Sequence, residues 1–322
     1  MATLLREADV ERVIEMEPVI DAVERSMREL GEGVAANVPR RRVFPPGNVL
    51  NVMFASFPGS GYYGLKSYSI GGGRVRFLVA LYRQDGETAG DLEALIEAGL
   101  LGAYRTGAAS GVAAKALAPA GPIEVAVIGS GYQARTQVHA ISRSLPVSRF
   151  RVFSRDSERR QAFVAELVEH LGIGAVASAT AEEAVRGAPV VVTMTNSGTP
   201  VLEAEWVEPG ALVIGAGSNI PTKAELPPEL VERAELVVVD QLEAARIESG
   251  DLLLAEASGH HDWDRTVELG AILAGREPGR RSGDGIVLFE SHGLALWDVA
   301  AGALVLERAR QARLGTEVEL FF

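Results

Sequence analysis

The 322-residue sequence contains no cysteine, which excludes disulfide bonds and thiol-based catalysis. It lacks any apolar run near the roughly 20 residues that a membrane-spanning helix requires, so we expect no membrane segment. Acidic residues begin at Glu7, too early for a signal peptide, and a cytoplasmic protein is expected. Basic residues are not in excess either: the formal net charge of −12 disfavours nucleic acid and anionic membranes as partners.

The remaining composition is typical of a large globular protein. Apolar residues make up 47% of the chain and charged residues 23%, and a chain of this length can bury a large core. We therefore expect about two domains.

The first part of the chain predicts a mixed α+β domain. Residues 1–35 carry apolar side chains at three-to-four-residue spacing, which indicates helical structure. Apolar runs separated by glycine- and proline-rich turns predict an antiparallel meander of strands at 49–54, 63–68 and 76–82. An alanine-rich helix is expected over 108–118, and the Pro/Gly segment 119–122 after it is interpreted as a joint between domains.

The second part alternates strands with helices, which predicts an α/β fold with a doubly wound parallel sheet of the Rossmann type. Strands are expected at 123–128, 149–154, 190–194, 211–215, 236–240 and 286–289. Helices are expected at 158–171 and 181–187. A last helix over 295–313 is long enough to return to the first domain.

The most informative segment follows the strand at 123–128 and reads Gly129-Ser130-Gly131-Tyr132-Gln133-Ala134. Gly129 permits a sharp turn, Gly131 lets backbone N–H groups approach a pyrophosphate, and Ala134 is small enough for close helix–strand packing. The helix that follows presents unpaired N–H groups and the positive end of its dipole to an anion. This strand–turn–helix pattern predicts dinucleotide binding.

The end of the next strand bears on the choice of dinucleotide. A cofactor without a 2′-phosphate usually meets a carboxylate there, whereas this chain has Ser154 and Arg155, which suit a phosphate. We therefore expect NADP(H) to be preferred. NAD(H) remains the alternative, because a small shift in register would bring Asp156 to the ribose.

Three basic residues from separate segments could bind a small anionic substrate. Arg41 lies in the triplet 40–42, Lys66 lies within an expected strand, and Arg105 precedes the alanine-rich helix. A guanidinium matches a carboxylate with paired donors. Each residue also has a simpler interpretation. Arg41 and Lys66 could be ordinary solvated charges. Arg105 could form an ion pair at the start of the helix, with Thr106 as the N-cap. Sequence alone does not show whether the three converge.

Two further loops follow buried strands. The segment Gly217-Ser218-Asn219 is expected at the crevice where parallel sheets bind ligands, although it could equally be a simple turn. His292, next to Ser291 and Gly293, could act as an acid or base or could be structural. The cluster 260–262 contains two histidines but lacks a third ligand at a recognisable spacing, so we predict no metal site.

Together these motifs resemble the ornithine cyclodeaminase/μ-crystallin family over nearly the whole chain. The resemblance rests on four ordered segments, 105–110, 129–134, 217–226 and 291–298. It implies a homodimer whose substrate and dimerisation domain comprises residues 1–118 plus 299–322, with a Rossmann domain of residues 119–298 inserted in it. It also implies that Arg41, or a neighbour in its triplet, acts with Lys66 and Arg105 to hold the substrate carboxylate beside the nicotinamide.

The resemblance also assigns further cofactor contacts, namely Thr106, Tyr132, Gln133, Ser218, Asn219, Ser291 and Gly293. In cyclodeaminases of this family an acidic residue stands at the position of Asn219. An amide does not take up a proton at neutral pH, so Asn219 disfavours the deamination of ornithine. The hypothesis is that NADPH reduces the C=N bond of a small 2-imino acid such as pyrroline- or piperideine-2-carboxylate, with Lys66, Arg105 and Asn219 at the reacting centre.

Three alternatives remain open at this point. The first is an NAD-dependent ornithine cyclodeaminase. The second is a dehydrogenase that makes alanine or an N-alkyl amino acid from an open-chain 2-oxo acid. The third is a non-catalytic binding protein like μ-crystallin, because fold alone does not determine activity.

Overall fold

The computed structural model describes residues 1–320 and divides into two compact units, each built on its own sheet. The first unit comprises residues 1–109 and the chain from Leu294 onward, and the second comprises residues 110–293. The first unit is thus discontinuous in sequence. Its boundaries come earlier than the expected positions 118 and 298, and Asp298 therefore belongs to the first unit.

The first unit contains a seven-stranded sheet in the order β15-β1-β6-β5-β4-β3-β2. Its strands are β1 (Ala2–Leu5), β2 (Ala36–Val43), β3 (Asn48–Phe57), β4 (Tyr62–Gly71), β5 (Arg74–Arg83), β6 (Leu92–Glu97) and β15 (Thr316–Val318). Each pair from β2 to β6 is antiparallel, which confirms the predicted meander. The edge is extended by β1, which runs parallel to β6 and antiparallel to β15.

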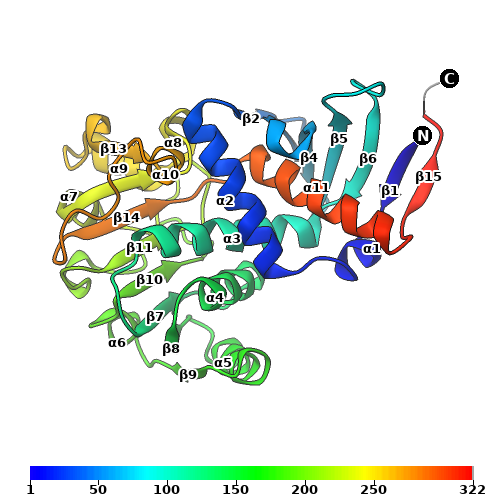
Figure 1. The fold of residues 1–322 in the computed structure, drawn as a ribbon. Helices are drawn as coiled ribbons and strands as arrows, with labels where there is room; N and C mark the ends of the chain where they lie inside the picture. The colour runs from blue at the N-terminus through cyan, green and yellow to red at the C-terminus, as the bar shows by residue number, and fades with distance from the viewer. Residues whose placement is uncertain (321–322) are drawn as a thin grey trace. The chain divides into compact units, whose positions relative to one another are not determined.

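Helices cover one face of this sheet. Helix α11 (Ala295–Gln311) packs on β2 to β5 and α1 (Glu7–Glu11) on β1 and β6, while α2 (Met16–Glu32) packs on α11 and α3 (Gly99–Leu117) begins in this unit. Figure 1 shows α2 in blue beside α11 in orange, although they come from opposite ends of the chain. The indole N–H of the buried Trp297 donates to the Met27 sulfur at 2.9 Å and joins the two helices.

Two expectations for the first unit were wrong in detail. Residues 1–35 are not wholly helical, because β1 pairs with β6 and β15, which lie far away in sequence. The alanine-rich helix begins at Gly99 rather than near residue 106, because the Glu7 carboxylate accepts the N–H groups of Gly99 and Leu100. A carboxylate at a helix N-terminus satisfies donors that have no partner within the helix.

The second unit contains an eight-stranded sheet in the order β13-β12-β14-β11-β10-β7-β8-β9. Its strands are β7 (Ile123–Ile128), β8 (Val147–Phe153), β9 (Gly174–Ala177), β10 (Val190–Thr193), β11 (Leu212–Gly215), β12 (Ala234–Val239), β13 (Thr266–Glu268) and β14 (Ile286–Glu290). All seven neighbouring pairs are parallel. The expected doubly wound parallel sheet is thereby confirmed.

The helices of the second unit are α4 (Tyr132–Ser144), α5 (Ser157–Leu171), α6 (Ala181–Val185), α7 (Pro228–Arg233), α8 (Leu242–Glu248), α9 (Gly250–Ala257) and α10 (Leu269–Leu273) (Figure 1). Central strands such as β10 and β11 are buried at every position, which explains why their sequences are continuous apolar runs. From β7 the chain proceeds to β8 and β9 on one side and returns to β10 on the other. At such a switch point, ligands bind beyond the carboxyl ends of the strands. Among residues 1–320, no helix combines the length and apolar character needed to cross a bilayer.

Candidate functional site

The turn after β7 requires glycine at its first position. Gly129 has φ = 123°, a conformation that side-chain-bearing residues rarely adopt, and a Cβ there would collide with the Met194 carbonyl oxygen. Its N–H donates to the Phe153 carbonyl at 2.8 Å, which ties the turn to the end of β8. The glycine therefore lets the chain pass closely between the ends of β8 and β10, the strands on either side of β7.

Gly131 serves a different purpose, because a Cβ there would meet nothing within 4 Å. It is the extended N-cap residue of α4 and offers no side chain to the first N–H groups of that helix. Ala134 is completely buried beneath the first turn. The helix therefore begins with accessible N–H donors and the positive end of its dipole, which suits the pyrophosphate of a dinucleotide.

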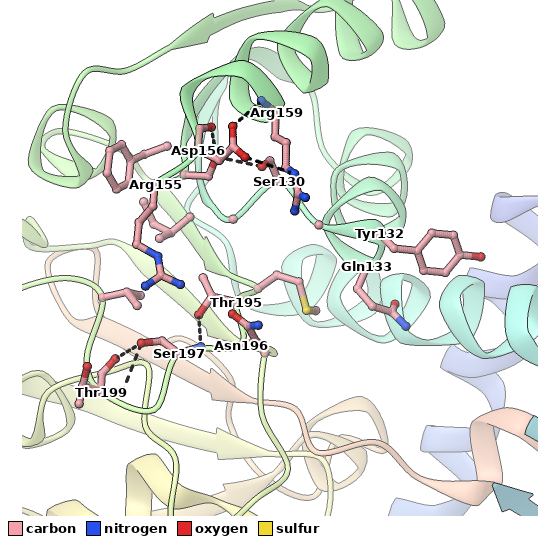
Figure 2. A pocket seen from close by; sticks show the side chains of 18 of the residues that line it. Ser130, Tyr132, Gln133, Arg155, Asp156, Arg159, Thr195, Asn196, Ser197 and Thr199 are labelled. Atoms are coloured by element: carbon pink, nitrogen blue, oxygen red, sulfur yellow. Dashed lines mark hydrogen bonds and ion pairs between the residues drawn. The ribbon is translucent and has the colours of Figure 1, made fainter. Parts of the chain in front are cut away.

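The glycine turn opens onto a cavity of about 710 Å³ within the second unit. Its walls come from the turn after β7, the end of β8, the loop after β10 and Gly217 after β11. Six predicted cofactor contacts line it: Gly129, Gly131, Tyr132, Gln133, Ser154 and Arg155. Figure 2 shows Ser130 and Tyr132 on one side and the loop with Thr195, Ser197 and Thr199 across from them. A cavity of this size and position fits a bound dinucleotide.

The end of β8 carries a small polar network. The Ser130 hydroxyl donates to the Ser154 hydroxyl at 2.9 Å, and the Arg160 guanidinium donates to the Ser154 carbonyl at 2.7 Å. The Asp156 carboxylate caps α5 by accepting the Arg159 N–H at 3.0 Å, and it pairs with the Arg159 side chain at 3.3 Å. Arg155 is exposed, and in Figure 2 its side chain extends toward Ser197.

The other predicted cofactor contacts lie elsewhere. Among the described residues, the cavity lining does not include Ser218, Asn219, Ser291 or Gly293. Ser218 and Asn219 follow Gly217 in the loop after β11, and the buried Ser291 and Gly293 follow β14. Thr106 belongs to the first unit and lies inside α3, where its hydroxyl donates to the Gly102 carbonyl at 2.7 Å. The interpretation of Thr106 as an N-cap was therefore wrong.

The first unit contains a buried charge cluster centred on Lys66. The Lys66 side chain is 2% exposed, and its Nζ donates to Oδ1 of Asp298 at 2.8 Å. The Arg105 Nε donates to the same oxygen at 3.2 Å. The other oxygen, Oδ2, has no hydrogen-bond partner among the described residues. A Cβ on Gly102 would lie 3.3 Å from Nζ, so this glycine leaves room for the ammonium beside α3.

Arg40, rather than Arg41, is the member of the basic triplet that belongs to this cluster. Arg40 is 4% exposed and its charge contributes to lowering the pKa of Lys66, whereas Arg41 is exposed. The pairing of β2 with β3 shifts register between Val38 and Arg41. A bulge of this kind moves side chains to the opposite face, which explains the difference of one position.

The cluster has more positive than negative charge. Two buried cations, Lys66 and Arg105, share Oδ1 of Asp298, and the charge of the buried Arg40 acts on Lys66. Burial, followed by the charge of Arg105, lowers the pKa of Lys66 to about 8 despite the raising effect of Asp298. Each cation also faces an aromatic ring; Lys66 Nζ lies 5.2 Å from the centre of Phe77. A buried group of cations with too few anions is suited to binding a carboxylate.

His292 belongs to a second buried network, in the second unit. Its Nδ1 lies 3.3 Å from Oδ1 of Asp240, and its Nε2 lies 3.7 Å from Oε2 of Glu290. Although burial opposes the charged form, Asp240, which bonds Nδ1, and the nearby Glu290 raise the pKa of His292 to about 10. Asp240 also accepts the N–H groups of His292 and Gly293. These contacts favour the structural interpretation of His292.

Sequence reasoning counted Asp298 in the motif 291–298 but gave it no role, and it preferred the wrong arginine of the triplet. Asp298 had a detectable signal, because it is an isolated acid in the apolar segment Ala295–Gly302 of a helix. Its partner Lys66 lies 232 positions away, however, so no local pattern connects them. The position of Arg40 had no such signal, because it depends on the bulge.

Comparison with known proteins agrees with this geometry. The sequence model of the ornithine cyclodeaminase/mu-crystallin family matches residues 1–313 of this chain. A Delta(1)-pyrroline-2-carboxylate reductase from Bacillus cereus is 35% identical over 231 residues, which cover 71% of each chain. The relatives thus include an enzyme whose name specifies a cyclic imino acid.

Solved structures are similar over the full length. The Thermococcus litoralis Delta(1)-pyrroline-2-carboxylate reductase, solved with NADH and L-proline, has a TM-score of 0.92 at 30% identity and covers 98% of this chain and 100% of its own. An archaeal alanine dehydrogenase dimer with bound NAD has a TM-score of 0.92 at 32% identity and covers 99% of each chain. This chain belongs to the ornithine cyclodeaminase/mu-crystallin family.

Proposed function

We propose that the protein is an oxidoreductase that reduces the C=N bond of small 2-imino acids with a reduced nicotinamide dinucleotide. Pyrroline-2-carboxylate and piperideine-2-carboxylate are the expected substrates. The observation that carries the proposal is the buried pair of Lys66 and Arg105 on one carboxylate, in a chain that also has a dinucleotide-type glycine turn. The names of the Bacillus and Thermococcus relatives support the same substrate class.

The residues present fit a dinucleotide. Gly131 leaves open space at the start of α4, where the pyrophosphate is expected to accept backbone N–H groups. Ser154, Arg155 and Arg159 line the cavity at the end of β8 and would hold a 2′-phosphate. The Asp156 carboxylate already caps α5 and pairs with Arg159, so its hydrogen-bonding capacity is partly used. These contacts support a preference for NADP(H) over NAD(H).

A single substitution tests the cofactor preference. Arg155→Ala is expected to weaken NADPH binding by roughly tenfold, because it removes a charge-assisted contact, and to leave NADH binding nearly unchanged. Kd values for both dinucleotides, measured by fluorescence titration, give the ratio. Equal losses for the two dinucleotides would contradict a 2′-phosphate site.

The chain's own residues bind and orient the substrate in this reaction. Lys66 and Arg105 would bind the substrate carboxylate, and Arg40 takes the place first predicted for Arg41. When bound, the reduced nicotinamide supplies the hydride that adds to the C=N carbon. Asn219 would orient the imine or the cofactor carboxamide by hydrogen bonding rather than act as a base, because an amide does not take up a proton at neutral pH. A protonated imine is already electrophilic, so little further acid catalysis is required.

The direct test compares NADPH and NADH oxidation with pyrroline-2-carboxylate and piperideine-2-carboxylate. We expect turnover of at least one imine, faster with NADPH. Dinucleotide binding without turnover of any imino acid would contradict the proposal and favour a binding protein. Release of ammonia and proline from L-ornithine and NAD⁺ would favour the cyclodeaminase instead.

A second candidate is a dehydrogenase of open-chain amino acids. The archaeal alanine dehydrogenase resembles this chain as closely in fold as the pyrroline-2-carboxylate reductase does, and the cation cluster would hold either carboxylate. Pyruvate with ammonia or methylamine, assayed beside the cyclic imines, separates the two activities. Higher kcat/KM for the open-chain mixtures would favour the dehydrogenase.

We also propose a homodimer formed through the outer face of the meander. Val38, Phe54 and Tyr63 are 42%, 43% and 38% exposed there, and they line an apolar groove of about 440 Å³ with Leu65 and Tyr82. A contiguous exposed apolar surface is typical of an interface, and the similar archaeal alanine dehydrogenase is a dimer. Light scattering should give twice the chain mass, and Phe54→Lys should reduce it.

A cytoplasmic location stays a prediction.

A further inference from the structure

Glu225 is a buried acid that the proposed chemistry leaves without a role. It lies in the second unit between β11 and α7, and its side chain is 1% exposed. An ionised carboxylate is costly to bury unless donors surround it. Its neighbours therefore indicate what it does.

Two loops of the dinucleotide cavity donate to this carboxylate. Oε1 accepts the backbone N–H of Thr195 at 2.7 Å, and Oε2 accepts the backbone N–H of Gly217 at 2.8 Å. The Thr193 hydroxyl adds a bond to Oε2 at 3.2 Å. Thr195 follows β10 and Gly217 follows β11, and both residues line the cavity. One side chain thus connects the ends of two neighbouring strands.

The backbone of the same residue holds the other end of the first loop. The Glu225 carbonyl accepts the Val201 N–H at 2.8 Å, so residue 225 fixes both ends of the segment 195–201. Inside that segment the Thr195 hydroxyl accepts the Ser197 N–H, and the Ser197 hydroxyl donates to the Thr199 carbonyl (Figure 2). The loop geometry therefore depends on an anchor at residue 225.

The backbone of Glu225 is itself held by a second buried acid, Asp251. Oδ1 of the buried Asp251 accepts the N–H groups of Glu225 and Leu226 at 2.7 and 2.6 Å. The Glu225 carboxyl group also requires a glycine at position 217, because a Cβ there would collide with it. Glycine at 217 lets the backbone lie directly against the acid.

We propose that Glu225 is a positioning residue for dinucleotide binding, whose carboxylate holds the loops after β10 and β11 in the geometry of the cavity wall facing the glycine turn. This inference rests on the proposed function, since it concerns the same cofactor. A wall that is fixed in advance does not have to be ordered when the ligand binds, which strengthens binding. Loss of the Glu225 carboxylate should therefore weaken dinucleotide affinity, although Glu225 itself makes no contact with the ligand in this proposal.

The anchor should also depend on pH. Burial raises the pKa of Glu225 to about 7, with Asp251 contributing and the N–H donors opposing the rise. The other charged groups of this buried region are Glu290, which interacts with both acids, and His292, which pairs with Asp240. Below pH 7 a proton on Glu225 replaces an acceptor by a donor, so the loops are held less firmly.

Glu225→Gln tests the proposal by presenting an amide NH₂ to one of the two backbone donors. At pH 8 we expect roughly tenfold weaker dinucleotide binding, because a charge-assisted bond is lost. Between pH 8 and pH 6 the affinity of the wild type should fall toward that of the variant, and the variant should change less. The 2′-phosphate of NADPH titrates near pH 6, but it does so in both proteins, so their difference is the readout.

Glu290→Gln is the matched control. Glu290 is equally buried, and Gln keeps the shape of its side chain without an ionisable group. Its side chain contacts Ser249 and His292 rather than the cavity loops. We expect Kd within about twofold of the wild type, a small change because no contact with the cavity loops is altered. Affinities are measured by calorimetry, with thermal unfolding recorded in parallel.

The outcomes separate the two proposals. If the wild type binds neither NADPH nor NADH, the proposed function fails. If it binds and Glu225→Gln matches it in affinity and pH dependence, the positioning role is wrong. Should Glu225→Gln not fold, Thr193→Val removes one donor and should move the pH midpoint of binding upward; an unmoved midpoint would overturn the proposal.

Discussion

The two units each bury a cluster of charged groups, and the clusters differ in sign and in how they are satisfied. In the first unit, Lys66 and Arg105 share the carboxylate of Asp298, and Arg40 acts on Lys66 through its charge. In the second unit the acids outnumber His292, and three of them, Glu225, Asp240 and Asp251, accept backbone N–H groups. In the first cluster two cations share one carboxylate, whereas the carboxylates of the second cluster are held by backbone N–H donors within the protein.

The first cluster is therefore suited to binding a ligand, whereas the second stabilises the conformation of loops. Buried charge without a counter-ion is unfavourable, so it persists where a ligand supplies the missing charge. Carboxylates held by backbone donors need no ligand and instead fix loop geometry. Perturbed titration alone would not distinguish the clusters, because the pKa values of both Lys66 and Glu225 are displaced toward neutrality.

The largest expected effect comes from Lys66→Ala. It should lower kcat/KM for the imino acid by on the order of 100-fold, because a buried charge contact to the substrate is lost. Dinucleotide Kd should not change. Lys115→Ala, at an exposed lysine, is the control and should match the wild type. Undiminished kcat/KM in Lys66→Ala would remove the distinction between the clusters.

Asp298→Asn tests the single carboxylate of the cationic cluster. Removing its charge leaves Lys66 and Arg105 without a buried counter-ion, and the free energy of unfolding should fall by about 3 kcal/mol. Urea denaturation measures the change, and Glu307→Gln at an exposed position of α11 serves as control. If 10 mM of a small carboxylate fails to restore any of the lost stability, the anion-binding interpretation is weakened.

Arg40→Ala compared with Arg41→Ala tests the effect of the bulge. We expect roughly a tenfold loss of kcat/KM in Arg40→Ala and less than a twofold change in Arg41→Ala, because only the former removes a buried cation of the cluster. Steady-state kinetics at pH 7 suffices. A greater loss in the Arg41 variant would restore the original assignment.

The smallest expected effect is a pH dependence of carboxylate binding. Because the pKa of Lys66 is about 8, its ammonium is present below that pH and is lost as the pH rises through it. Binding of cyclopentanecarboxylate, which has no titrating nitrogen, should therefore weaken above pH 8, by less than about tenfold in total because Arg105 keeps its charge. Lys66→Arg should abolish the weakening. A wild-type profile that is flat from pH 7 to 10 would contradict this assignment.

Features set by local sequence were predictable. The strand at 123–128 and the Gly-x-Gly turn that begins α4 depend on neighbouring residues, and they were predicted at the positions observed. The start of α3 was not, because the donors at Gly99 are accepted by Glu7, about 90 residues earlier. Strand β1 was missed for a similar reason, since its partners are β6 and β15.

Local sequence patterns were enough to predict the parallel sheet, the glycine turn and the presence of basic residues suited to a carboxylate. Apolar periodicity and backbone freedom at glycine act over a few residues, so they can be recognised in a single chain. Only the tertiary structure decided that Arg40 rather than Arg41 joins Lys66, that Asp298 faces both cations, and that Glu225 anchors two loops. Those contacts depend on a register shift and on residues far apart in the chain, where burial rather than local pattern selects the partner.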